Sequence, residues 1–195
     1  MTGNHKTWSQ TFQNALVSGT VASIVSTISM AILGKRELDQ TAAPLNGPSQ
    51  WVWGRHAPYQ NRFSLRYTIM GYAIHHAASV FWAILYEKLR HRRSPTGSGA
   101  AAIAPAIVTA AAAYVVDFYV APKRLTPGFE RRLSKRSLLM VYGTFALGLA
   151  GGVLVNRYCP PSQGRRPPSN GRRPHLTGRL KKSSPRLSGQ PCHPV

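Results

Sequence analysis

The sequence has few acidic residues, and this shortage dominates its composition. Its 195 residues contain 5 Asp+Glu against 25 Lys+Arg, which gives a formal net charge of +20. Such a balance is typical of nucleic-acid binders, and the mean hydropathy of −0.19 also argues against a membrane protein. Both averages mislead, because charged and apolar residues are segregated along the chain. Residues 156–195 hold nine Lys+Arg and no acid, whereas four stretches between residues 12 and 155 are nearly free of charge.

Cysteines are also scarce, and the sequence patterns of common active sites are absent. Cys159 and Cys192 both lie in the Pro-rich C-terminal segment, and no C-x2-C spacing is present. This excludes an obvious disulfide framework or zinc site, and we expect unpaired thiols. The chain also lacks a G-x-S-x-G, a P-loop, an H-E-x-x-H and a Rossmann glycine pattern. We therefore expect no catalytic residues, no metal, no cofactor and no enzymatic activity.

The sequence does contain four apolar stretches that are long enough to cross a bilayer. A helix that crosses ~30 Å of hydrocarbon needs about 20 apolar residues. The stretches are Phe12–Leu33, Tyr67–Tyr86, Ala100–Ala121 and Ser137–Val155. The first is longer than the apolar run of about 7–15 residues in a signal peptide, and no A-x-A site follows it. The other three lack the polar face of a soluble amphipathic helix.

These stretches predict an all-α fold, an integral membrane bundle of four transmembrane helices in residues 1–157. Residues 158–195 are rich in Pro, Arg, Ser and Gly, and we expect a disordered tail there. Anionic lipid headgroups are the nearest polyanion for its basic residues. Specific nucleic-acid binding is not expected, because no aromatic residues in the tail are placed to stack on bases.

The connector at residues 34–66 is the longest, and it contains Trp51 and Trp53. Indole rings favour the headgroup layer of a membrane. We therefore expect this loop to lie on the membrane surface, with both tryptophans as interfacial anchors and room for a short interfacial helix.

An even number of spans places both termini on one side of the membrane. Counting Lys+Arg near the span ends gives ten on the side of the termini and eleven on the other, so this rule does not decide the orientation. Export of a tail with nine basic residues against the membrane potential is unfavourable. We therefore expect a multi-pass protein of the bacterial inner membrane with both termini in the cytoplasm.

Small residues recur at four-residue spacing in the first and fourth spans. The first has Ala15, Gly19, Ser23 and Thr27, and the fourth has Thr144, Gly148 and Gly152. In lipid, helices associate through close backbone packing at such residues. We expect this packing within the bundle, and a homo-oligomer is the alternative.

Ionisable residues at membrane depth are costly and usually face the bundle interior. Three fall in the spans, namely His75, His76 and Asp117. At 1.5 Å per residue, His75 lies about 12 Å and Asp117 about 6 Å from the face that carries the Trp-rich connector. Tyr142 lies about 7.5 Å from that face, and Ser29 falls in the same layer. The depths predict a polar cluster of His75, His76, Asp117 and Tyr142.

Several roles for this cluster remain open at this stage. A contact between a histidine and Asp117 would satisfy both groups and suits proton or cation handling, or a ligand pocket. A structural hydrogen-bond network is the plainer interpretation. Asp117 could instead reach the interface and pair with Lys123 or Arg124.

Three segments resemble a known kind of protein. They are residues 44–54 (PLNGPSQWVWG), residues 71–76 (GYAIHH) with Phe81-Trp82, and residues 122–130 (PKRLTPGFE). They are similar to small bacterial inner-membrane proteins of about four helices, a family of unknown function. The resemblance covers roughly residues 10–157, and it implies location and fold but no activity. The function expected is a structural, assembly or ligand-binding membrane bundle, with transport of a proton, cation or solute as the alternative.

Overall fold

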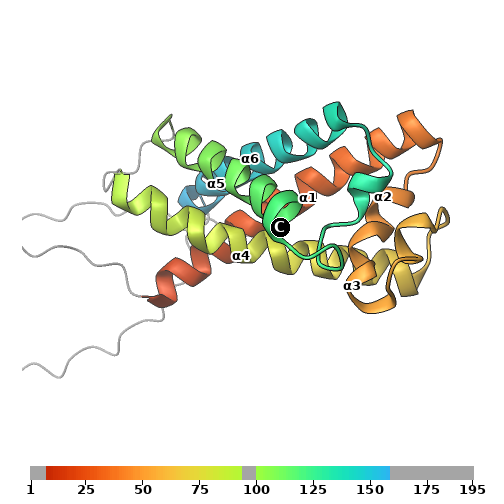
Figure 1. Ribbon diagram of the computed structural model, residues 1–195. Helices are drawn as coiled ribbons and strands as arrows, with labels where there is room; N and C mark the ends of the chain where they lie inside the picture. Colours follow the sequence, from red (N-terminus) through yellow and green to blue (C-terminus); the bar gives the residue numbers. More distant parts are fainter. Residues whose placement is uncertain (1–7, 94–99, 159–195) are drawn as a thin grey trace, which may run out of the picture. The chain divides into compact units, whose positions relative to one another are not determined.

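The computed structural model describes residues 8–93 and 100–158, and all regular elements in these ranges are helical. The expected tail lies outside the described residues except for Tyr158, which ends the last helix. Four helices are long or strongly apolar (Figure 1): α1 Trp8–Leu38, α4 Met70–Arg93, α5 Ile103–Val115 and α6 Lys135–Tyr158. Two helices of a single turn, α2 Ala43–Asn46 and α3 Gln50–Trp53, lie in the first connector.

Short turns complete the elements. The 3-10 turns are Gly47–Ser49, Ala57–Tyr59, Ala100–Ala102 and Phe129–Arg131. Two π-helical turns extend the long helices at the end where the first and third connectors lie: Leu65–Ile69 precedes α4, and Val116–Val120 follows α5. Turns of this kind are rare and occur often at functional sites.

The all-α prediction is confirmed, and four helices have the length and apolar composition to cross a membrane. They span Trp8–Leu38, Leu65–Arg92, Ile103–Val120 and Lys135–Asn156. The first is 31 residues long, or roughly 46 Å at 1.5 Å per residue, so it is longer than a hydrocarbon layer.

The distribution of residue sizes across α1 suits a bundle surrounded by lipid. Its buried side is built from small residues, including Ala15, Ala22 and Ser26, whereas large apolar residues such as Ile24 and Ile28 are exposed. A water-soluble helix shows the opposite arrangement, with its apolar side against the core. Small residues allow helices to approach closely, which is the main source of helix association in lipid.

The glycines of α6 pack against α1 within the same chain. A Cβ added at Gly148 would lie 2.4 Å from the Cα of Ala22, and one added at Gly152 would lie 2.4 Å from the Cα of Ser18. On the other side of α1, a Cβ at Gly19 would lie 2.7 Å from the Cα of Val80 in α4. The small residues of α1 and α6 therefore form close contacts within the bundle, where α1 packs against both α4 and α6.

The first and third connectors fold together into one unit, which we call the cap (residues 39–66 and 121–134). Its two parts meet where a Cβ at Gly47 would lie 2.6 Å from the backbone nitrogen of Phe129. Gln50 Nε2 donates to the backbone oxygen of Thr126 at 2.5 Å. Gly128, with φ of +84°, takes the left-handed conformation at this contact.

Buried polar groups tie the cap to the start of α4 and to the π-helical turn that precedes it. Asn46 Nδ2 donates to the backbone oxygens of Gln60 at 2.8 Å and Arg62 at 3.2 Å, and Thr68 Oγ1 donates to Asn46 Oδ1 at 2.6 Å. A Cβ at Gly71 would lie 2.1 Å from the oxygen of Leu45. The three segments that carry the family resemblance thus pack against one another, and the first connector is more folded than a surface loop.

Candidate functional site

A cavity of about 510 Å³ lies below the cap, between α4 and α5. Its walls are mostly apolar and come from the four long helices and from both parts of the cap. Polar groups reach it from Ser26, His75, Asp117 and Tyr142, and six aromatic rings line it: Trp51, Phe81, Trp82, Phe129, Tyr142 and Phe145.

Asp117 stands in the π-helical turn that follows α5, and its partner comes from α6. The hydroxyl of Tyr142 donates to Asp117 Oδ2 at 2.6 Å. The Tyr142 ring packs edge-on against Tyr114 and Phe118, with centroids 5.3 Å and 5.8 Å away. This packing restrains the Tyr142 ring, and its hydroxyl holds the carboxyl group of Asp117 in the cavity wall.

His75 enters the cavity from α4 and contacts Ser26 of α1. The two side chains meet with Nε2 and Oγ 2.9 Å apart. The Ser26 hydroxyl has a single proton, and the backbone oxygen of Ala22, 2.7 Å away, is a second acceptor for it. The imidazole tautomer sets the direction of the shared bond: Nε2 donates when it carries the proton, and it accepts from the Ser26 hydroxyl when it does not.

The structure brings three of the four predicted residues to one cavity and leaves His76 outside it. The His76 ring packs on Tyr72 with centroids 5.9 Å apart, and its buried Nδ1 has no hydrogen-bond partner within the described ranges. Consecutive residues of a helix project about 100° apart, so His75 and His76 cannot both face one cavity. Ser29 does not line the cavity either, and Ser26 takes its place.

The predicted contact between a histidine and Asp117 is not among the hydrogen bonds and ion pairs of the described residues. Each group has another partner: Ser26 for His75, and Tyr142 for Asp117. Asp117 also accepts from Tyr142 rather than pairing with Lys123 or Arg124, so its carboxyl group remains inside the bundle.

The two tryptophans of the cap have different surroundings. Trp51 lines the cavity, and its Nε1 donates to the backbone oxygen of Thr126 at 3.2 Å. Trp53 Nε1 donates to the oxygen of Arg66 at 2.9 Å, and the Arg66 guanidinium lies 4.4 Å from the Trp53 ring centroid. Both rings are partly exposed, as interfacial anchors would be, but Trp51 is also part of the cavity wall.

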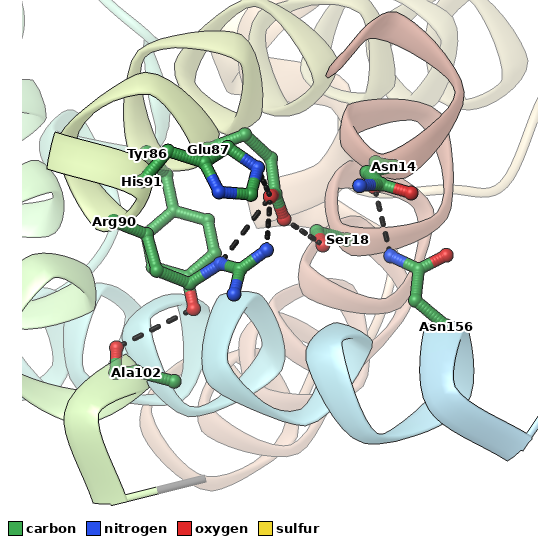
Figure 2. A network of polar contacts seen from close by, with 8 residues as sticks. All are labelled: Asn14, Ser18, Tyr86, Glu87, Arg90, His91, Ala102 and Asn156. Atoms are coloured by element: carbon green, nitrogen blue, oxygen red, sulfur yellow. Dashed lines mark hydrogen bonds and ion pairs between the residues drawn. The ribbon is translucent and has the colours of Figure 1, made fainter. Parts of the chain in front are cut away.

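A second buried polar group, which the sequence reasoning missed, lies at the other end of the bundle. Glu87 of α4 has an exposed fraction of 0% and stands at the centre of the network in Figure 2. Its Oε2 accepts from Arg90 Nη2 at 2.7 Å, and its Oε1 accepts from Ser18 Oγ of α1 at 3.0 Å. His91 Nε2 lies 3.6 Å from Oε2.

Two more bonds in Figure 2 join helices at this end of the bundle. Tyr86 donates through its hydroxyl to the backbone oxygen of Ala102 at 3.4 Å, which links α4 to the turn before α5. Asn156 Nδ2 donates to the oxygen of Asn14 at 3.2 Å, which links α6 to α1. The network fastens the helices together and contains no cavity-lining residue of the first site.

Within residues 8–93 and 100–158, no three His, Cys, Asp or Glu side chains are placed to hold a metal ion. Comparisons with family models, curated proteins and solved structures gave no match to this chain.

Proposed function

We propose that the chain is a multi-pass integral membrane protein whose cavity binds a small, mostly apolar molecule. The cavity itself is the observation that supports this proposal. Its volume of about 510 Å³ falls in the range of about 300–1,000 Å³ that ligand pockets occupy. Apolar walls with a few fixed polar groups are also typical of such pockets.

Part of the cavity wall is exposed on the flank of the bundle. Phe81 of α4 and Val116 of the turn after α5 both line the cavity, and their exposed fractions are 58% and 37%. Trp51 and Leu125 of the cap also line it, with exposed fractions of 38% and 43%. We propose that a ligand dissolved in the bilayer enters between Phe81 and Val116.

The packing of the bundle interior favours ligand binding over transport across the membrane. The polar groups at the cavity and those around Glu87 lie at opposite ends of the bundle. The interior between them is filled by Ala22, Ala83 and Leu149, all with exposed fractions of 0%. A transporter would need to open this packed layer. A purely structural bundle gains nothing from the cavity, because unfilled space forfeits packing contacts.

We further propose that the protein lies in the bacterial inner membrane and belongs to the four-helix family that residues 10–157 resemble. The lipid bilayer is its immediate partner, and anionic headgroups are the proposed contact of the basic tail. Both termini are assigned to the cytoplasm for the reason of charge given above.

Photolabelling with a neutral phenyl diazirine tests the binding proposal. In lipid nanodiscs, we expect saturable labelling of cavity residues that excess unlabelled analogue prevents. Ala78 lines the cavity, so Ala78→Trp fills it and is expected to abolish the saturable labelling. Ala111→Trp, on the exposed face of α5, is the matched control and is expected to leave it unchanged. Mass spectrometry of the labelled peptides gives the measurement.

Labelling that rises in proportion to probe concentration and marks only lipid-facing residues would contradict the proposal. Equal labelling of the two tryptophan variants would contradict it as well.

A further inference from the structure

We infer that the cavity selects a lipophilic organic cation whose positive charge lies at Asp117. This inference rests on the proposed function, since it names the chemical class of the ligand for the same cavity. Two features of the site carry it: a carboxyl group without a basic partner among the described residues, and a wall of aromatic rings.

The carboxyl group of Asp117 lacks a cationic partner among the described residues. Its polar contact is the Tyr142 hydroxyl at 2.6 Å, and no Lys, Arg or His nitrogen of residues 8–93 and 100–158 is paired with it within 4.0 Å. Glu87, by contrast, has Arg90 beside it. A buried charge is costly unless it is paired. A cationic ligand would supply the pair that the bundle does not provide at Asp117.

The rings around the cavity favour the same kind of ligand. Trp51, Phe81, Trp82, Phe129 and Phe145 contribute to its wall together with Tyr142. The faces of aromatic rings carry negative potential and attract organic cations, most strongly where water is excluded. The rings also provide the apolar surface that the hydrophobic part of such a ligand would cover.

Other classes of ligand fit this wall less well. An anion would meet the carboxyl group of Asp117. A hard inorganic cation requires about six oxygen ligands, whereas the side-chain oxygens at the cavity belong to Asp117, Tyr142, Ser26 and Ser79. Exposed basic residues of the cap, such as Arg55 and Lys123, disfavour entry of a cation past the cap. The wall residues that are exposed on the flank of the bundle, Phe81 and Val116, carry no charge.

A pair of ligands of the same shape tests this inference. Phenyltrimethylammonium and tert-butylbenzene differ in charge and have nearly the same shape. Each is used to compete with the phenyl diazirine on the full chain in nanodiscs, at matched concentrations in the bilayer. We expect the cation to compete at about one tenth of the concentration that the neutral compound needs, which corresponds to 1.4 kcal/mol. If tert-butylbenzene competes as well as phenyltrimethylammonium or better on the wild-type chain, the inference is overturned.

Asp117→Asn then assigns the preference to the carboxyl group. The amide oxygen still accepts from Tyr142, so the wall is retained. We expect the concentration of the cation needed for competition to rise about 30-fold or more, because loss of one partner of a buried charge pair weakens binding by this order. The potency of tert-butylbenzene is expected to change by less than about twofold. Asp39→Asn, which removes an exposed acid outside the cavity, is expected to change neither.

The outcomes separate this inference from the proposed function. Competition by tert-butylbenzene, together with equal binding of the cation by wild type and Asp117→Asn, would overturn the cation site and leave the cavity as a binding site. Failure of both compounds to compete, with no saturable labelling, would overturn both proposals.

Discussion

Replacement of Glu87 by alanine is expected to lower the stability of the bundle by about 3–5 kcal/mol. Arg90 has an exposed fraction of only 7%, and Glu87 is the acidic residue that it contacts. Removal of the carboxyl group leaves a guanidinium buried without a counter-charge, and Ser18 loses its acceptor. Thermal or denaturant unfolding of the purified protein in detergent measures the change.

The double variant Glu87→Met/Arg90→Met is the informative control. It removes both charges and fills their place with apolar side chains of similar volume. We therefore expect it to be much more stable than Glu87→Ala and close to wild type. Asp39→Ala removes an exposed carboxyl group that contacts Lys35, and the unfolding midpoint is expected to stay unchanged. A Glu87→Ala protein as stable as wild type would show that the buried pair does not hold α4 in place.

Gly148→Val is expected to separate α6 from α1 and to cost about 3 kcal/mol or more. A Cβ at this position would lie 2.4 Å from the Cα of Ala22 and 3.0 Å from its backbone nitrogen. Backbone atoms cannot rotate away as a side chain can, so the two helices have to move apart. Loss of the contact is expected to lower the unfolding midpoint and the yield of monodisperse protein.

Gly143→Val is the matched control on the same helix. A Cβ at Gly143 has no heavy atom within 4 Å, because the residue faces outward. The same substitution is therefore expected to leave stability close to that of wild type. Equal losses from the two variants would point to an effect on the helix itself, and would contradict close packing between α1 and α6.

The four long helices could be predicted from the sequence, because an uncharged run of about 20 residues is a local property. The fold of the cap could not. Gln50 and Thr126, for example, are 76 positions apart in sequence, and nothing in the neighbourhood of either residue indicates the other. The composition of the first connector predicted only that its tryptophans lie at the membrane surface. It did not predict that Asn46 is buried at the centre of a folded unit.

The depth of the candidate-site residues along the helices could be predicted from the sequence. The directions in which their side chains point were harder to predict. The rise of 1.5 Å per residue predicts His75, Asp117 and Tyr142 in one layer, and all three line the cavity. The direction of a side chain around the helix axis depends on how the helices pack, and the sequence does not show it. His76 and Ser29 fall at the predicted depth but do not line the cavity, whereas Ser26 does. Glu87 was missed because an acid at the edge of an apolar run resembles the end of a span. Its spacing of three from Arg90 was the available signal of an ion pair.

Single-cysteine labelling in intact cells tests most directly whether the chain crosses the membrane four times. His56→Cys and Arg124→Cys, in a background without Cys159 and Cys192, mark the two parts of the cap. Ser98→Cys marks the connector between the second and third spans, and the native cysteines mark the tail. A membrane-impermeant maleimide is expected to label both cap positions from outside. The connector and the tail are expected to react only after the cells are broken. The fully reversed pattern would overturn the orientation alone, whereas labelling of the cap and the connector from the same side would contradict the four-span bundle.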